Sequence, residues 1–314
     1  MTSTKIAVVG AGHVGATFAY TLMVRGLVSE IVLIDVNRER AEGEAMDLNH
    51  AAPLVSSTRV SAGDYGDCEG AAIIVIAGGA AQTPGETRLQ LTQRNAAIFR
   101  EIIPQIVRNN SEAILLVTTN PVDVLTYAAG ELSGLPSERV IGSGTVLDSA
   151  RLRYLLSQHY GIDPQSVHAY IIGEHGDSEV PVWSLANIAG MRLEAFCAAQ
   201  GLEHNASMRS IFEETRNAAY RIIERKGATY YAISAALLRI IEAILRDQKT
   251  VLTVSTRIAN AYGIRNVSLS LPAVVGRSGV ERVLNLELSS DELDRLHESA
   301  ATIRKAIVSV GFDS

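Results

Sequence analysis

The stretch Lys5-Ile-Ala-Val-Val-Gly10-Ala-Gly12-His-Val-Gly15 decides the fold. Its apolar first half predicts a strand, and the residues after Gly12 have a helical pattern, so the glycines fall at a strand-to-helix turn. At such a turn Gly10 allows the tight bend, Gly12 lets a pyrophosphate approach the backbone, and Gly15 lets the helix pack on the strand. The helix N-terminus then stabilises the phosphate charge. The stretch therefore predicts a dinucleotide-binding α/β fold.

An acidic residue follows this turn at the sequence separation typical of a residue that binds the cofactor ribose. Asp35 stands 20 positions after Gly15, directly behind the predicted strand Glu30–Ile34. An aspartate at this place accepts hydrogen bonds from both ribose hydroxyls and repels a 2′-phosphate, which favours NAD over NADP. The alternative is that Asp35 only caps the helix that follows it.

The first half of the chain alternates short apolar segments with helical ones. We predict strands at Lys5–Val9, Glu30–Ile34, Ala71–Ala77 and Ala113–Val117, and helices at His13–Arg25, Arg38–Ala51 and Gln90–Arg108. Because strands that alternate with helices form a parallel sheet with right-handed connections, residues 1–142 are expected to form a doubly wound Rossmann domain.

The pattern changes after Gly142. We predict helices at Val146–Tyr160, Ser207–Lys226 and Tyr230–Arg246, antiparallel strands at Val251–Val254, Val267–Leu271 and Arg282–Leu288, and a last helix opened by a capping box of Ser289 with Glu292. Residues 143–314 are therefore expected to form a second domain, of the α+β class, that binds the substrate.

Composition narrows the functional classes. A net charge of −6 over 314 residues offers no basic excess for nucleic acid. No segment reaches the roughly 18 apolar residues that span a membrane, and the N-terminus lacks the apolar core of a signal peptide. Two distant cysteines, Cys68 and Cys197, indicate neither a disulfide framework nor a zinc site. We expect a cytoplasmic protein with a small-molecule substrate.

One histidine is flanked by glycines and carboxylates in Gly173-Glu-His175-Gly-Asp-Ser-Glu179. It directly follows the apolar run Ala169–Ile172, so its ring is presented at a turn after a strand. Histidine titrates nearest neutral pH, which makes His175 a candidate proton donor and acceptor. A structural histidine and a metal ligand are the alternatives.

Asp148 and Arg151 share one face of a predicted helix, because they stand three residues apart. An arginine fork binds a substrate carboxylate in bidentate fashion, and a carboxylate can hold one nitrogen of a histidine ring. The loop Gly142-Ser-Gly144-Thr before them is suited to close approach. A plain surface ion pair is the alternative.

Two further segments follow strands at the same edge of the sheet. The glycine-flanked loop from Gly78 to Arg88 is long enough for a lid over the site. Asn120, in Asn120-Pro121, can donate to a substrate oxygen, unless it is only a turn residue before a proline.

Together these motifs resemble the bacterial L-lactate dehydrogenases of the lactate/malate dehydrogenase family over essentially the whole chain. The motifs that carry the resemblance are Gly10–Gly15, Gln82-Thr-Pro-Gly-Glu-Thr-Arg88, Thr119-Asn120-Pro121, Asp148-Ser-Ala-Arg151 and Gly173-Glu-His175-Gly-Asp. The resemblance implies reversible reduction of pyruvate to (S)-lactate by NADH, the last step of fermentative glycolysis.

The resemblance also implies a role for each site residue. His175 is expected to exchange the proton, Asp148 to orient it, and Arg88 to polarise the carbonyl after lid closure. The substrate contacts are expected to be Gln82, Arg88, Asn120, Arg151 and Thr229. The cofactor contacts are expected to be Gly10, Gly12, Val14, Gly15, Asp35, Gly78, Asn120 and Ser143.

Gln82 is the position that separates the two main branches of the resembled family. Malate dehydrogenases carry an arginine there, which pairs with the second carboxylate of oxaloacetate. A neutral amide leaves that charge unpaired, at a cost of several kcal/mol. We therefore expect pyruvate to be preferred.

Regulation and assembly are implied by the resemblance alone. Arg153 and His168 match positions at which bacterial relatives bind the activator fructose 1,6-bisphosphate across a subunit interface. The alternative is an exposed arginine and a satisfied strand histidine. Related enzymes are homotetramers.

The sequence is also compatible with three other functions. They are a malate or other 2-hydroxyacid dehydrogenase, an NAD-binding sensor without catalysis, and a metal enzyme at His175. A sensor does not require Arg88, Asp148, Arg151 and His175, and no cysteine–histidine cluster supports the metal enzyme.

Overall fold

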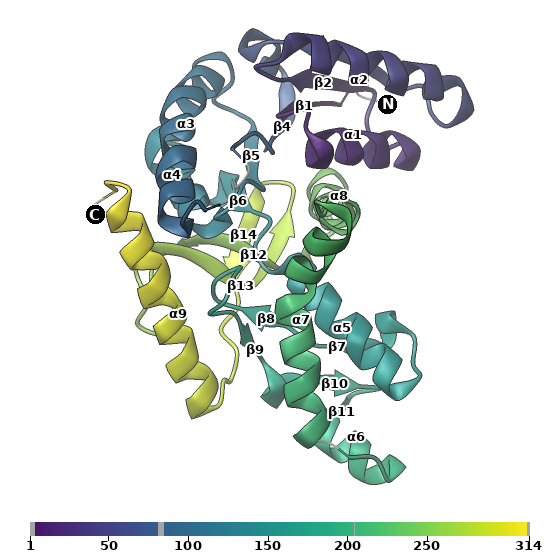
Figure 1. The fold of residues 1–314 in the computed structure, drawn as a ribbon, viewed down its shortest axis with the longest axis vertical. Helices are drawn as coiled ribbons and strands as arrows, with labels where there is room; N and C mark the ends of the chain where they lie inside the picture. The colour runs from purple at the N-terminus through teal and green to yellow at the C-terminus, as the bar shows by residue number, and fades with distance from the viewer. Residues whose placement is uncertain (1–3, 81–84, 204, 313–314) are drawn as a thin grey trace.

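The computed structural model describes residues 4–80, 85–203 and 205–312, and Gln82 lies outside them. Within this part of the chain, a nine-stranded sheet forms the centre in the order β14-β13-β12-β6-β5-β4-β1-β2-β3 (Figure 1). Its parallel part consists of β1 (Lys5–Val9), β2 (Glu30–Ile34), β3 (Arg59–Gly63), β4 (Ala71–Ile76), β5 (Ile114–Val117) and β6 (Val140–Gly142). The order 3-2-1-4-5-6 is that of a doubly wound Rossmann sheet, which confirms the predicted fold class.

Helices cover both faces of this sheet. One face carries α1 (His13–Arg25), α2 (Arg38–Ala51) and α8 (Tyr231–Leu245). The other carries α3 (Arg88–Asn109), α4 (Val122–Ser133) and α9 (Ser290–Ser309) (Figure 1). None of the helices in the described residues is both long and apolar enough to cross a membrane.

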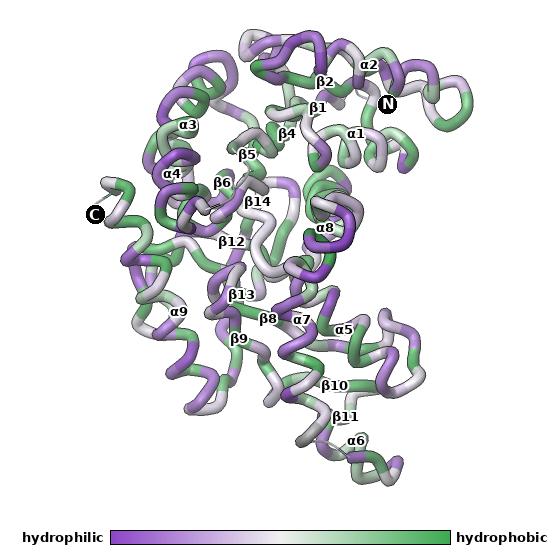
Figure 2. Tube along the Cα trace, viewed as in Figure 1, coloured by the Kyte–Doolittle hydropathy of each residue, from purple (hydrophilic) through white to green (hydrophobic). Residues whose placement is uncertain are grey.

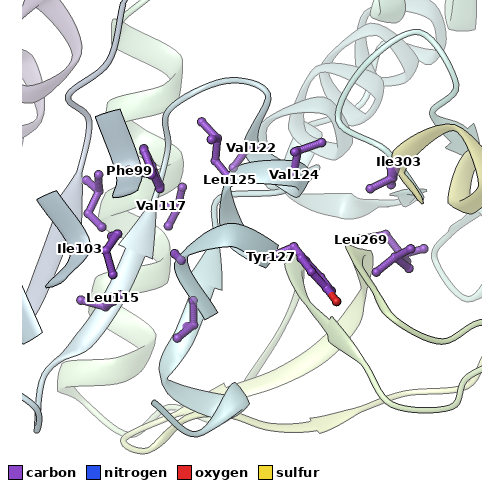
Figure 3. Packing of buried hydrophobic residues seen from close by; sticks show 14 of the residues in the cluster. Phe99, Ile103, Leu115, Val117, Val122, Val124, Leu125, Tyr127, Leu269 and Ile303 are labelled. Atoms are coloured by element: carbon purple, nitrogen blue, oxygen red, sulfur yellow. The ribbon is translucent and has the colours of Figure 1, made fainter. Parts of the chain in front are cut away.

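Alternating residues of each strand belong to the two cores. In β1, Ile6 and Val8 pack with α1 and α8, whereas Ala7 and Val9 pack toward α3. In β1, β4 and β5 every position except Lys5 is apolar, because helices cover both faces of the sheet there, and the hydropathy of these strands follows this pattern (Figure 2). Phe99 of α3 and Tyr127 of α4 fill the second core (Figure 3). Losing such a ring to alanine costs about 3–5 kcal/mol, so these two helices are firmly packed on this face of the sheet.

The second half of the chain extends the same sheet. Three antiparallel strands, β12 (Thr250–Ile258), β13 (Val267–Gly276) and β14 (Gly279–Val283), continue it, and β12 pairs with β6 at Ser255 and Gly142. A third core lies under α5 (Val146–Tyr160), α6 (Leu193–Gln200) and α7 (Asn205–Lys226). Short strands complete this region: β7 (Val167–His168), β8 (Ile171–Ile172), β9 (Val180–Pro181), β10 (Asn187–Ile188) and β11 (Met191–Arg192).

The predicted strand Arg282–Leu288 is wrong over most of its length, because β14 ends at Val283. Leu286 and Leu288 are partly buried against the core of α4 and α9, so an irregular segment carries their apolar pattern. The helices α4 and α6 and the strand β3 lie outside the predicted elements. Their short, mixed patterns give little periodicity to recognise.

Candidate active site

A glycine sets the turn that carries His175. Gly173, directly after β8, has a φ of +85° and exchanges two backbone hydrogen bonds with Ser270 of β13, at 2.8 and 2.9 Å. A Cβ at this glycine would come within 2.7 Å of the Ser299 hydroxyl oxygen on α9. The left-handed backbone and the lack of space both require glycine, so the turn is held against β13 and α9.

A second close approach places α5. Gly144 has a φ of +52°, and a Cβ there would lie 2.4 Å from the backbone nitrogen of Ser255 on β12. The loop Gly142–Thr145 thus approaches protein backbone, which sets the start of α5 and brings Asp148 and Arg151 toward the turn at 173–179.

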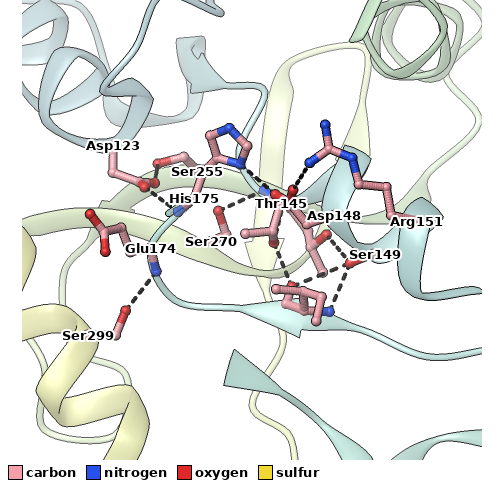
Figure 4. A network of polar contacts seen from close by, with 12 residues as sticks. Asp123, Thr145, Asp148, Ser149, Arg151, Glu174, His175, Ser255, Ser270 and Ser299 are labelled. Atoms are coloured by element: carbon pink, nitrogen blue, oxygen red, sulfur yellow. Dashed lines mark hydrogen bonds and ion pairs between the residues drawn. The ribbon is translucent and has the colours of Figure 1, made fainter. Parts of the chain in front are cut away.

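Asp148 joins the two other members of the predicted constellation (Figure 4). Its Oδ1 accepts a hydrogen bond from Nη1 of Arg151 at 2.7 Å, and its Oδ2 lies 2.5 Å from Nδ1 of His175. The Asp148 side chain is 3% exposed and that of Arg151 14%. A plain surface ion pair is therefore the wrong interpretation of these two residues.

Charge and burial compete at this histidine. Burial lowers the pKa of His175, but attraction to Asp148, the hydrogen bond with it and the charge of Asp123 raise that pKa to about 9. Burial likewise opposes ionisation of Asp148, yet His175 and Arg151 hold its pKa below the ordinary value. The pair is thus arranged as an imidazolium beside a carboxylate, with Nε2 as the exchangeable proton site.

A cavity of about 690 Å³ lies beside this pair. The predicted residues that line it are Val14, Asn120, Ser143, Arg151, His175 and Thr229. Residues of α7, of α8 and of the segment between them form an apolar wall of the cavity, and the loop before α3 contributes Glu86. The further lining residues are Gly85, Glu86, Thr118, Leu147, Ala219, Ile223, Gly227, Ala228 and Ile233. The guanidinium of Arg151, the imidazole of His175 and an apolar wall therefore line one cavity.

Several lining or supporting residues were missed by sequence reasoning. Thr118 lines the cavity, and its buried hydroxyl has no hydrogen-bond partner among the described residues. Asn95 on α3 is buried, and it binds the Asn120 carbonyl at 2.8 Å and the Ala80 N–H at 2.7 Å. In the sequence, Thr118 could have been recognised only by its position directly after the buried strand β5. No comparable pattern marks Asn95.

The glycine turn has the geometry that its sequence predicts. Gly10 has a φ of +101°, and a Cβ there would lie 2.4 Å from the backbone nitrogen of Gly78. A Cβ at Gly15 would lie 1.9 Å from the Gly10 carbonyl oxygen. A Cβ at Gly12 would meet nothing within 4 Å, so the space in front of α1 is open to a pyrophosphate. These residues fit a dinucleotide.

Asp35 is not the cap of the following helix. Its Oδ2 accepts from the N–H of Ala11 at 2.7 Å and its Oδ1 from the N–H of Asn37 at 2.9 Å. Asn37 caps α2 by accepting from the N–H of Arg40. The carboxylate therefore lies at the glycine turn.

Arg88 is held away from the reacting centre. Its Nη2 donates to Glu174 at 2.7 Å and its Nη1 to Asp177 at 3.2 Å. Tyr220 of α7 donates to the other oxygen of Asp177 at 3.1 Å. As far as the lining is described, Arg88 does not contribute to it.

The two residues of the predicted effector site lie on elements that pack against each other, Arg153 on α5 and His168 on β7. Arg153 on α5 donates to the Pro164 carbonyl at 3.1 Å, and its buried Nε has no partner among the described residues. His168 is exposed on β7. In the described residues, no group of three or more His, Cys, Asp or Glu side chains could hold a metal ion. Neither Cys68 nor Cys197 forms a disulfide, and both are buried.

The Rossmann sheet, the open glycine turn and the cavity define a dinucleotide-binding α/β enzyme fold. Residues 4–142 match the lactate/malate dehydrogenase NAD binding domain, and residues 145–311 match the alpha/beta C-terminal domain of the same family. The chain belongs to the lactate/malate dehydrogenase family, and its cofactor is NAD.

Relatives of known identity cover nearly the whole chain. An L-lactate dehydrogenase of Acetivibrio thermocellus is 52% identical over 304 residues, which is 96% of each chain. L-lactate dehydrogenase 1 of Clostridium acetobutylicum is 50% identical and covers 98% of this chain and 99% of its own. The structure of the minor L-lactate dehydrogenase of Enterococcus mundtii, at 37% identity, superposes with a TM-score of 0.97 over the full length of both chains. These findings confirm the resemblance to bacterial L-lactate dehydrogenases.

Proposed function

We propose that the chain is an NAD-dependent L-lactate dehydrogenase, which reversibly reduces pyruvate to (S)-lactate. The observation that carries the proposal is the carboxylate of Asp148, which binds Arg151 and His175 at once. Both of these side chains line the same cavity. A cation for a carboxylate and a proton donor for a carbonyl then lie side by side, as a 2-oxoacid requires.

The protein positions the substrate and moves the proton. Arg151 binds the carboxylate of pyruvate through its guanidinium, of which Nη1 is held by Asp148. His175 protonates the reacting oxygen from Nε2, while Nδ1 stays on Asp148, which stabilises the charged ring. In lactate oxidation the neutral ring accepts that proton. NADH, when bound, supplies the hydride that this chemistry needs.

Three other residues complete the substrate site. Asn120 and Thr229 line the cavity, where they bind substrate oxygens. Arg88 moves from Glu174 to the carbonyl when the loop at 78–88 closes, and it stabilises the charge that develops there.

We assign the cofactor contacts with the support of the same geometry. Gly10, Gly12, Val14, Gly15 and Gly78 surround the open turn that takes the pyrophosphate, and Asp35 accepts from the ribose hydroxyls. Ser143 and Asn120 line the same cavity as His175, and there they contact the nicotinamide.

The charges of the cavity favour a monocarboxylate. Within the described lining, the arginine is Arg151, and Glu86 contributes a carboxylate that pairs with Arg94 at 2.8 Å. A second substrate carboxylate would find no further arginine in the described lining. Gln82 offers it no cation, and an unpaired buried charge costs several kcal/mol. Pyruvate is thus favoured over oxaloacetate.

We infer the finer points from the resemblance. Residues 1–142 are the NAD-binding domain and 143–314 the substrate domain. Arg153 and His168 bind fructose 1,6-bisphosphate, which activates a homotetramer. The enzyme is cytoplasmic and completes fermentative glycolysis.

The deciding experiment follows NADH oxidation with pyruvate, oxaloacetate, 2-oxobutyrate and phenylpyruvate. We expect kcat/KM to be at least 100-fold higher for pyruvate than for oxaloacetate. A preference for oxaloacetate would identify a malate dehydrogenase instead, and NADH binding without turnover of any 2-oxoacid would identify an NAD-binding sensor.

A further inference from the structure

A stack of two rings joins the glycine turn to the opposite wall of the cavity. His13 is the first residue of α1, directly after Gly12, and its ring stacks on that of Tyr230. The ring centroids are 5.3 Å apart, and the planes make an angle of 24°. Two aromatic rings in this arrangement attract each other beyond the effect of the area that they bury. Because Tyr230 directly precedes α8, the stack connects two segments that are far apart in the sequence.

The neighbours of both rings line the cavity. Val14 follows His13 on α1, and Thr229 precedes Tyr230. Beyond the stack, α1 packs along α8 (Figure 1). A shift of either ring therefore displaces a residue of the cavity, one on the side of the glycine turn and one on the side of the apolar wall.

The wall at Thr229 is a short connector, residues 227–230, between α7 and α8. Its first residue, Gly227, has a φ of +82°, and a Cβ there would meet nothing within 4 Å. Close packing thus does not hold the connector at this end. Because Gly227, Ala228 and Thr229 all line the cavity, the shape of the wall depends on what else fixes the connector.

A cation and two rings fix the ends of the connector. Nζ of Lys226, the last residue of α7, lies 3.5 Å from the centroid of the Tyr230 ring and 4.1 Å from that of Tyr231. These two rings meet edge to face, with centroids 4.5 Å apart. An ammonium over an aromatic face is attracted by it. Lys226 therefore closes the connector on itself, and His13 ties the same ring to the glycine turn.

These contacts are weak enough to respond to a ligand. His13 and Lys226 are exposed, and Tyr231 is 68% exposed. Ring contacts at such places contribute little to the stability of the fold, and segments held by them open readily. A pyrophosphate bound to the backbone at Gly12 fixes the first turn of α1. His13 is then held where Tyr230 stacks on it, and the connector is ordered before a substrate arrives.

We propose that His13 and Tyr230 are positioning residues, which transmit occupation of the glycine turn to the connector that carries Thr229. An ordered connector loses less entropy when a 2-oxoacid binds, so NADH and the 2-oxoacid favour each other. By linkage, each raises the affinity for the other by the same factor. This inference rests on the proposed function only for the identity of the substrate.

The first test follows the connector without a substrate. ADP-ribose is the probe, because it carries the pyrophosphate but lacks the nicotinamide that would contact the wall directly. Hydrogen–deuterium exchange is measured in the peptide that contains residues 227–230 and in the one that contains residues 10–15. In wild type, we expect ADP-ribose to slow exchange in both peptides. In His13→Ala, the connector should exchange as in the free protein, whereas the turn should stay protected.

Two further variants and a control make this comparison specific. His13→Phe keeps an aromatic ring and should restore the protection of the connector. Tyr230→Leu removes the partner ring and should lose that protection as His13→Ala does, so the test does not depend on the folding of one variant. His159→Ala removes an exposed ring that contacts Tyr160 on α5, and both peptides should then behave as in wild type.

The second test measures the coupling between two ligands. NADH binding is followed by its fluorescence with and without saturating oxamate, an unreactive analogue of pyruvate. In His13→Ala, we expect the factor by which oxamate tightens NADH binding to fall about three- to tenfold, which is the size of one aromatic pair. The double variant with Tyr230→Leu should lose no more than either single variant, because both substitutions remove the same contact.

The outcomes separate this inference from the proposed function. If NADH binds but oxamate does not, and no 2-oxoacid is reduced, the proposed function fails, and hydrogen exchange still decides the coupling. Equal protection of the connector by ADP-ribose in wild type and in His13→Ala overturns the inference, as does a wild type in which ADP-ribose protects only the turn. Additive losses in the double variant also overturn it, because the two rings would then act separately.

Discussion

Arg88 is ion-paired with Glu174, its Nη2 lying 2.7 Å from Glu174 Oε1. The Glu174 side chain is only 10% exposed, and its second oxygen accepts from the Ser178 hydroxyl at 2.6 Å. The acid next to the proposed proton donor thus holds the arginine that we propose to reach the substrate. Substrate binding has to compete with this pair.

Weakening the pair should therefore make lid closure easier. In Glu174→Gln, which keeps an oxygen for Ser178, we expect the KM for pyruvate to fall about two- to fivefold, in keeping with an ion pair worth about 0.5–1 kcal/mol. Asp177→Asn should act in the same direction but less, because the Asp177 side chain is 63% exposed and 3.2 Å from Arg88. Glu112→Gln, in the exposed pair with Arg139, is the control. An unchanged KM in Glu174→Gln would show that the pair does not oppose closure.

Substrate choice should follow the charge at the lid. We expect Gln82→Arg to raise kcat/KM for oxaloacetate by at least tenfold and to lower that for pyruvate, because the new cation pairs with the second carboxylate. Gln82→Leu, which changes the amide without adding charge, is the control and should not favour oxaloacetate. Steady-state kinetics with both acids measure the ratio. A gain of oxaloacetate activity in the leucine variant would assign the effect to cavity shape.

The two directions of the reaction should depend on pH in opposite ways. His175 must be protonated to reduce pyruvate, so kcat/KM falls as pH rises through about 9 in the NADH complex, if the cofactor leaves the pKa of the free protein unchanged. Lactate oxidation needs the neutral ring and rises over the same interval.

Asp148→Asn should shift that profile. It removes the main interaction that raises the His175 pKa, so the fall should move to lower pH, and kcat should drop by about 10²–10³. Asp291→Asn, an exposed carboxylate on α9, is the control. A pH profile that survives Asp148→Asn unchanged would exclude His175 as the proton donor.

Activation by a sugar bisphosphate should require the cation of Arg153. We expect fructose 1,6-bisphosphate to lower the pyruvate concentration at half-saturation, because a guanidinium attracts phosphate. Arg153→Gln should abolish the effect, whereas Arg139→Gln should retain it. Identical saturation curves with and without the bisphosphate would remove this site from the proposal.

Local patterns sufficed to predict much of the fold. The turn Gly10–Gly15 follows a strand and opens a helix as predicted, and Asp35 lies against it. Asp148 and His175 were also singled out, because a glycine-flanked histidine and an i,i+3 acid–arginine pair are visible in a short window. The family resemblance supplied the roles that no window shows.

The missed features depend on contacts between distant segments. Asp123 stands 52 residues before His175 and 132 before Ser255, so its buried position follows from the packing of α4 against β12. The segment Arg282–Leu288 has strand-like alternation, but β14 ends at Val283, and Leu286 and Leu288 beyond it pack against the core as part of an irregular segment. Glu174 and Arg88 meet across 86 residues.

The sequence by itself thus determined the Rossmann sheet, the glycine turn and the candidate groups for the chemistry, because each depends on residues within one turn or one strand. Only the tertiary structure decided which charges face one another. The pKa of His175 depends on Asp148 from α5 and Asp123 from α4. Burial strengthens the attraction between these charged groups, but it also disfavours the ionised form of each of them. The balance between the two effects exists only when the helices have packed.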